Sequence, residues 1–545
     1  MKLKSLSSIS YKSSYVVMVL LVVFASIIRL YQLGAIPLSL YYDEITSVYF
    51  PFLYFQGEMR LPIISVLISI VTGTIPIYGF AGPSAFWTRF PSVVYGVLFV
   101  VVCWALGKKL YEQRVGMIAG LLASVIPWSL HFSRYGVVCV ISYAFYVTLA
   151  VYLLVLYFQT GKDRFKFAAF IAVGVSLYTH AMALIFDTLF FPLIIFAGFV
   201  YNRTKLRKLL KNMLLFFTIF LVFVLPFLVS YLFMAEQFSF TTYTTIQCSS
   251  GVIGLLEGVV KRAYLHLSPD FLVISTGKSF SLFNGSGEFI TQTGLYYFGT
   301  AGKIGILNVY GIFVYLGFLW LIYKVVKRPI VSFQWILLVW WVASYAIASG
   351  FAYYDNPNAA RNIVGLPAFI LVISLVISKV WHVLFNSRDG YISRRALKRS
   401  FPVKTLKSLF LISLIVPSVY YLPTYFLTYE SSYEYFDYDY KLLADYLTKN
   451  QLWSNSIVLN ETRPDKWYAG IVLSFYNYSA KKRIVLGDLF TAFSMLKYRK
   501  NTVMYVTRDM SNQSGLSPLF LFTFLDVIYY PDNTPVFAVW KINRL

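Results

Sequence analysis

The chain has 545 residues, of which 58% are hydrophobic, 19% aromatic and 13% charged, and its mean hydropathy is +0.67. Because a soluble domain is usually about 25% charged, this composition excludes an ordinary soluble protein and indicates a polytopic α-helical membrane protein. The formal net charge of +24 does not indicate a nucleic-acid partner, since the basic residues fall between apolar runs instead of gathering on one surface.

Apolar runs long enough to cross a bilayer recur along the chain. Lys2, Lys4 and Lys12 precede the first run without a convincing cleavage site, so we expect a retained helix and not a signal peptide. Eleven spans are expected, near 15–33, 89–107, 115–131, 137–158, 167–182, 184–200, 212–233, 304–323, 330–350, 362–381 and 408–427.

The short basic loops predict how the chain is oriented, because Lys and Arg concentrate in cytoplasmic loops. They lie at 108–114, 162–166, 203–211, 324–328 and 388–407. A cytoplasmic N-terminus would make all of these loops cytoplasmic, and an odd number of spans then puts the C-terminus outside. We expect a multi-pass protein of the plasma membrane in this orientation.

Two further segments belong to the predicted outer side. The apolar stretch 61–80 is interrupted by Gly73, Pro76 and Gly79, which favours short helices in the membrane interface over another span. The tail alternates helix and strand patterns, which predicts a small extracytoplasmic α/β domain. We therefore divide the chain into a membrane domain, 1–428, and a tail domain, 429–545. The tail helices are expected at 441–450 and 465–478, and its strands at 456–460, 483–486, 503–507, 526–530 and 536–542.

Asp43 and Glu44 are adjacent carboxylates shortly after the first span, on its outer side. A charge beside lipid is costly, so an acidic pair at the membrane surface indicates a functional site. The alternative is a turn in a solvated loop.

Other candidate residues fall on the same predicted side. The turn after the third span carries His131 and Arg134, and an arginine fork suits phosphoryl oxygens. The alternative for this turn is an interfacial anchor. His180 ends the fifth span and Asp187 follows it, although a lone histidine at a helix end is often structural.

Two more arginines lie near the outer ends of spans. Arg361 opens the tenth span, where a cation can bind an anionic lipid head group. Arg29, near the outer end of the first span, can extend its side chain outward. We expect no cofactor, because no two of the four histidines have the spacing of metal ligands on a helix. A divalent metal is left as the alternative.

Several short segments resemble those of the multi-spanning GT-C glycosyltransferases, most nearly the protein O-mannosyltransferases and aminoarabinose transferases. The likeness covers roughly residues 15–425. The segments are Arg29-Leu30-Tyr31-Gln32-Leu33-Gly34, Asp43-Glu44, Phe132-Ser133-Arg134-Tyr135, Tyr178-Thr179-His180, and Arg361 followed by Pro367.

The resemblance implies a polyprenyl-phosphate sugar as donor, dolichyl- or undecaprenyl-linked, and Asp43 as catalytic base. Glu44 would orient Asp43 or bind the acceptor. Some relatives carry a second acid in the second external turn, where this chain has Arg134-Tyr135-Gly136, so the need for a second carboxylate stays open. Oligosaccharyltransferases carry Trp-Trp-Asp in their soluble part. Here Trp340-Trp341 lies within a span, which disfavours transfer of a whole oligosaccharide.

Transfer from a lipid phosphate requires a base for the acceptor hydroxyl and cations for the leaving phosphate. Asp43 meets the first requirement, and Arg134, His180 and Arg361 are candidates for the second. One carboxylate in a direct displacement predicts inversion at the anomeric carbon. The expected partners are the lipid-linked donor, membrane lipids and a protein, glycan or lipid acceptor. The alternative function is a transporter or glycan flippase, which should carry charges near the middle of the bilayer.

Overall fold

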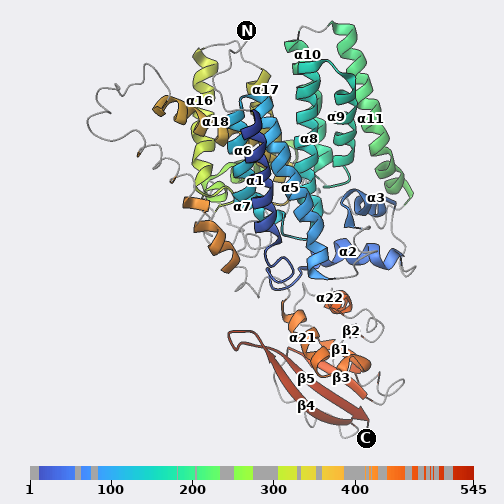
Figure 1. Cartoon of the computed structure of the whole chain (residues 1–545). Helices are drawn as coiled ribbons and strands as arrows, with labels where there is room; N and C mark the ends of the chain where they lie inside the picture. The colour runs from blue at the N-terminus through green and yellow to red at the C-terminus, as the bar shows by residue number, and fades with distance from the viewer. Residues whose placement is uncertain are drawn as a thin grey trace.

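A computed structural model places the chain in two parts, a bundle of long helices and a smaller α/β part (Figure 1). The described residues are 11–55, 63–74, 84–180, 182–202, 205–233, 251–273, 305–327, 333–351, 359–385, 405, 412, 416–418, 420–427, 438–460, 469–476, 484–486, 491–492, 495, 502–508 and 520–544. Most of the predicted basic cluster at 388–407 lies outside them.

The bundle helices follow the predicted apolar runs. Six helices in the described part are long and apolar enough to cross a membrane, and three shorter apolar helices accompany them. The chain is a multi-pass membrane protein, while the expected number of eleven spans stays a prediction. The bundle contains α1 (Tyr11–Leu30), α5 (Ala85–Leu110), α6 (Gln113–Val125), α8 (Val138–Thr160), α9 (Asp163–Ser176), α10 (Ala183–Tyr201), α11 (Leu206–Phe233), α16 (Gly311–Lys327), α17 (Phe333–Phe351) and α18 (Leu366–Phe385).

The predicted third span, 115–131, is broken. Helix α6 ends at Val125, and Ile126 has an extended ψ of 133°. Pro127 then begins the separate helix α7 (Pro127–Phe132). The prediction of one continuous helix is wrong here, because a proline disfavours helical backbone in the residue before it.

The segments that carry the basic loops gather at one end of the helix bundle. The C-terminal ends of α5 and α16, the turn between α8 and α9, and the start of α11 lie at the end of the bundle remote from the α/β part (Figure 1). These are the segments that carry the basic loops. The structure thus gathers them at one end, and which side of the membrane that end faces stays a prediction.

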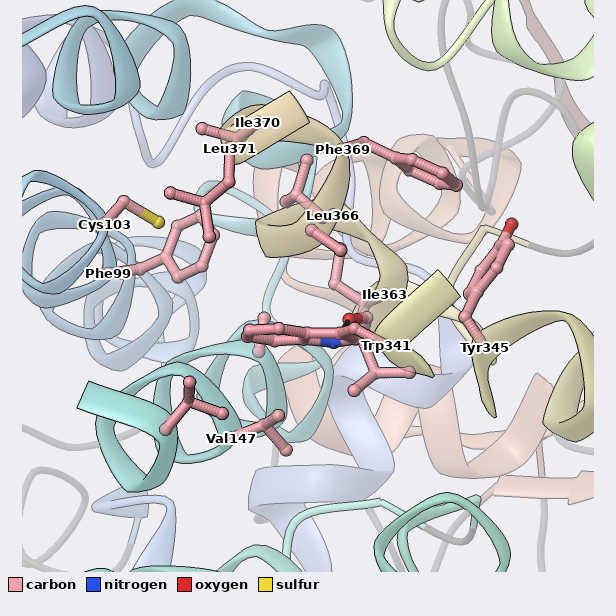
Figure 2. Packing of buried hydrophobic residues seen from close by; sticks show 14 of the residues in the cluster. Phe99, Cys103, Val147, Trp341, Tyr345, Ile363, Leu366, Phe369, Ile370 and Leu371 are labelled. Carbon is pink, nitrogen blue, oxygen red and sulfur yellow. Dashed lines mark hydrogen bonds between the residues drawn. The ribbon is translucent and has the colours of Figure 1, made fainter. Parts of the chain in front are cut away.

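Two buried tryptophans organise the core beside the turn that precedes α18. The Trp341 indole donates to the Val364 carbonyl at 2.9 Å, and the Trp128 indole donates to the Ala359 carbonyl at the same distance. Figure 2 shows Trp341 among Ile363 and other apolar side chains from several helices. This packing fixes the backbone on both sides of Arg361.

Short helices lie at the other end of the bundle, next to the α/β part. Helix α2 (Tyr42–Phe55) runs across the bundle end and is followed by α3 (Ile63–Val71) (Figure 1). At nine residues α3 is about 13 Å long, which is too short to cross a bilayer. The described residues 63–74 therefore agree with the prediction of short helices in this stretch.

The tail forms a five-stranded sheet in the order β2-β1-β3-β5-β4. Strand β1 is parallel to β2 and β3, whereas β5 is antiparallel to β3 and β4. The predicted small α/β fold is confirmed, although β4 begins at Phe520 instead of residue 526. The elements are α21 (Tyr438–Lys449), β1 (Ser456–Asn460), α22 (Ala469–Tyr476), β2 (Ile484–Leu486), β3 (Thr502–Thr507), β4 (Phe520–Tyr529) and β5 (Pro535–Arg544).

The tail and the membrane part share a hydrophobic core. Ile45, Val48 and Tyr49 of α2 are buried in one cluster with Leu443 of α21 and Val472 of α22. Helix α2, which begins beside the acidic pair, is therefore the surface on which the α/β part docks.

Candidate functional site

Glu44 is fully buried in an ion pair with Arg89 of α5. Arg89 Nε donates to Glu44 Oε1 at 2.9 Å, and both side chains have 0% exposure. The backbone amides of Tyr41 and Gly136 also donate to the carboxylate, at 3.0 and 2.6 Å. A Cβ at position 136 would lie 2.9 Å from Glu44 Oε1, so the close approach of this turn requires glycine.

Arg89 also holds the loop that leads to the acidic pair. Its Nη1 donates to the carbonyls of Leu33 and Pro37 at 3.1 and 2.9 Å, and its Nη2 donates to that of Ser39 at 2.6 Å. One guanidinium thus fixes residues 33–39 and the first turn of α2 on the end of α5.

Asp43 is the half-buried neighbour of Glu44 in the first turn of α2. A carboxylate is favourable at a helix N-terminus because of the helix dipole. Asp43 lies close enough to the Cys139 thiol, near the start of α8, for an electrostatic interaction.

His180 and Arg361 meet beside the same end of α8. The His180 ring stacks on Tyr143, with centroids 5.6 Å apart and an interplanar angle of 8°. Tyr143 follows Cys139 by one helical turn and so lies on the same face of α8. The short helix η2 (Ile363–Gly365), just after Arg361, also packs against α8. The structure therefore brings Asp43, His180 and Arg361 around the first turns of α8.

The electrostatics of this group keep His180 neutral at physiological pH. Burial, and then the Arg361 cation, lower the pKa of the His180 imidazole from 6.5 to about 4. The Met182 amide donates to His180 Nδ1 at 3.1 Å, which places the remaining ring proton on Nε2. His180 is thus a neutral donor next to a cation.

Asp187 lies one layer deeper, in the bundle. Its carboxylate is buried and accepts hydrogen bonds from Ser176 Oγ at 2.6 Å and from the Tyr143 hydroxyl at 3.4 Å. The hydrogen bond between Tyr143 and Asp187 orients the tyrosine ring on which His180 stacks.

Arg134 and Arg29 are buried against helix ends. Arg134 Nη1 donates to the carbonyls of Ile28, Arg29 and Tyr31 at 2.7–3.0 Å, at the C-terminus of α1. Arg29 in turn donates to the carbonyls of Ala123 and Ser124 at the end of α6. The expectation that Arg29 extends outward is wrong, because these carbonyls carry the negative end of the helix dipole. Arg134 is buried in the same way, with its guanidinium also over the Phe426 ring, 4.8 Å from the ring centroid.

His131 is also buried, and its ring stacks on that of Tyr135 with centroids 5.3 Å apart. The turn of residues 131–136 thus packs into the bundle, whereas His180 and Arg361 lie near the start of α8, as Asp43 does.

Three features near this site were not predicted from the sequence. Arg89 stands at the first residue of a predicted span, and a charge at that position was the available signal. Nothing in the sequence distinguishes Tyr143 from other tyrosines in spans. His266 Nε2 lies 2.7 Å from Asn362 Nδ2, beside Arg361, but the pairing joins residues 96 positions apart.

The described residues contain no group of three or more side chains arranged to hold a metal.

Comparison with known proteins places this geometry in context. Residues 64–230 match the family described as dolichyl-phosphate-mannose-protein mannosyltransferase. Apo ArnT from Cupriavidus metallidurans is 11% identical, with a TM-score of 0.55 over 98% of both chains. ArnT bound to undecaprenyl phosphate is 12% identical, with a TM-score of 0.53 over 96% of this chain and 97% of that chain. A search of curated proteins finds no match.

The apo oligosaccharyltransferase from Archaeoglobus fulgidus is 14% identical, with a TM-score of 0.51, over 92% of this chain and 70% of that chain. ArnT and the oligosaccharyltransferase are both GT-C glycosyltransferases. The chain has the GT-C fold. The predicted resemblance is thereby confirmed at the level of fold, and the match to the mannosyltransferase family includes Arg89 and His180.

The buried pair of this GT-C fold is expected to carry much of the local stability. Glu44→Gln and Arg89→Gln should each lower the free energy of unfolding by about 3–5 kcal/mol, because each leaves a buried charge without its partner. The control is Asp163→Asn, which removes a 2.9 Å pair with Lys166 in which the Asp163 side chain is 65% exposed. That variant should lose less than about 1 kcal/mol. Unfolding in detergent measures all three, and equal losses would contradict the assignment.

His180 should make stability depend on pH. Since the pKa of His180 is about 4 in the folded protein and 6.5 as the ordinary value, the unfolded chain binds more protons between these values. Stability then falls as the pH falls through this window, by up to about 1.4 kcal/mol per pH unit. His180→Asn should flatten the slope, whereas the neighbouring Thr179→Val should keep it. Denaturation curves from pH 7 to 4 test this, and an unchanged slope in His180→Asn would be evidence against it.

Proposed function

We propose that the protein is a membrane glycosyltransferase that moves a sugar from a polyprenyl-phosphate donor to an extracytoplasmic acceptor. The observation that carries the proposal is the convergence of Asp43, His180 and Arg361 around the first turns of α8. The GT-C fold and the partial match to the mannosyltransferase family support it.

Asp43 would be the general base. It is half-buried, whereas Glu44 is enclosed by Arg89 and two backbone amides. Asp43 would take the proton of the acceptor hydroxyl as the oxygen attacks the anomeric carbon. Glu44 would act through its neighbour, by fixing the first turn of α2.

Arg361 and His180 would bind the phosphate of the donor. As the anomeric carbon–oxygen bond breaks, its electron pair stays on the lipid phosphate, and a cation stabilises the growing charge. Arg361 supplies that cation, and neutral His180 can donate through Nε2. One carboxylate as base, with a single displacement, predicts an inverted anomeric carbon.

A transporter or lipid-linked glycan flippase is the second candidate, because either would also use charged groups within the membrane. Asp187 favours it, being a buried acid within α10. Its two hydrogen-bond donors, Ser176 and Tyr143, account for that burial without a transported substrate. Release of free polyprenyl phosphate from a labelled donor separates the two, since transport leaves the donor intact.

Asp43→Asn should abolish transfer, because an amide cannot accept the acceptor proton. Purified protein would be incubated with radiolabelled dolichyl- and undecaprenyl-phosphate sugars, and free lipid phosphate measured. We expect a loss of at least about 100-fold, the contribution of a general base. Asp163→Asn, at the opposite end of the bundle, should keep full activity. Turnover in Asp43→Asn close to the wild-type rate would rule out Asp43 as the base.

Arg361→Ala should weaken use of the donor more than use of the acceptor, because the lost cation contacts the lipid phosphate. We expect the donor KM to rise by about tenfold or more, as a charge-assisted hydrogen bond contributes about 1.5–3 kcal/mol. The acceptor KM should stay within a factor of two or so of the wild type, whatever the donor effect. Arg164→Ala, at the start of α9, is the matched control. An unchanged donor dependence would count against phosphate contact by Arg361.

A further inference from the structure

The last two residues of α22 contact the membrane part on either side of the acidic pair. The Tyr476 hydroxyl and Ser39 Oγ are hydrogen-bonded at 2.8 Å. The Phe475 ring meets the Tyr49 ring edge to face, with centroids 6.3 Å apart. Ser39 precedes Asp43 in the loop, and Tyr49 follows it in α2. Figure 1 shows α22 on the side of the α/β part that faces the bundle.

The Ser39 contact continues directly into the buried ion pair. The Ser39 carbonyl accepts from Arg89 Nη2 at 2.6 Å, and Arg89 Nε donates to Glu44 Oε1 at 2.9 Å. Ser39 is 2% exposed and Glu44 is fully buried, so water does not compete for these bonds. Hydrogen bonds through Ser39 and Arg89 therefore join Tyr476 of the tail to Glu44, the residue next to Asp43.

We propose that the tail domain positions Asp43, with Tyr476 and Phe475 as its positioning residues. The effect on catalysis rests on the proposed function, whereas the effect on the loop does not. Tyr476 holds the loop before the acid and Phe475 holds α2 after it, so the first turn of α2 is fixed from both sides. The tail domain is then part of the machinery that orients the base.

The size of the effect follows from the size of the contact. A hydrogen bond contributes about 0.5–1.5 kcal/mol, which corresponds to about a twofold to tenfold change in rate. Because a displaced base acts on the chemical step, the loss should appear in kcat and leave the donor KM unchanged.

The test removes the bond from both ends. Tyr476→Phe, Ser39→Ala and the double variant would be compared with Tyr529→Phe, which alters a tyrosine that is 50% exposed on the edge strand β4. Each single variant should lower kcat by about twofold to tenfold. The double variant should be no slower than the singles, since both remove one bond. Tyr529→Phe should match the wild type.

Hydrogen exchange gives a second measurement that needs no activity. Tyr476→Phe should speed exchange of the Tyr41 and Glu44 amides, while the amides of β1 and β3 keep their protection. Wild-type kcat or wild-type exchange in this loop would overturn the proposal, and so would additive losses in the double variant. If the wild-type protein transfers no sugar, the proposed function fails, and exchange alone decides whether the tail positions the loop.

Discussion

The buried ion pair between Glu44 and Arg89 is the constraint on which the end of the bundle next to the α/β part depends. Burying two charges costs several kcal/mol for each ion, and the attraction between them offsets this cost only when further hydrogen bonds complete the geometry. Here the amides of Tyr41 and Gly136 donate further hydrogen bonds to the Glu44 carboxylate. Three backbone carbonyls accept the remaining hydrogen bonds of the Arg89 guanidinium. The pair thereby connects α5, the loop after α1, the first turn of α2 and the turn before α8.

Two other buried arginines show how the fold tolerates cations with few acids nearby. Arg29 and Arg134 donate to carbonyls at the C-termini of α6 and α1. Each helix end carries about half a negative charge, so the backbone supplies the partner that a carboxylate would otherwise provide. Acidic side chains are then left for other roles, and Asp43 stays half-buried beside the buried Glu44.

The proposed site draws on segments that are far apart in the chain. Asp43 begins α2, His180 precedes α10, and Arg361 precedes α18, yet all three lie around the first turns of α8. Neutral His180 and charged Arg361 would serve a phosphate differently, the first as a hydrogen-bond donor and the second as a counter-charge. The tail packs on α2 from the other side, so Asp43, the proposed base, lies between the membrane part and the α/β part.

Composition and patterning alone gave the class of the protein and most of the helices and strands, and they singled out the acidic pair for the proposed site. Apolar runs locate helices because bilayer thickness sets their length, and alternating patterns located the tail strands to within a few residues, except for the start of β4. The break at Ile126 followed from Pro127 and could have been foreseen. Tertiary structure alone decided which charges are buried and which gather with Asp43 around the first turns of α8. Arg89 and Arg134 have the same side chain, and what they contact depends on helix ends that meet only in three dimensions.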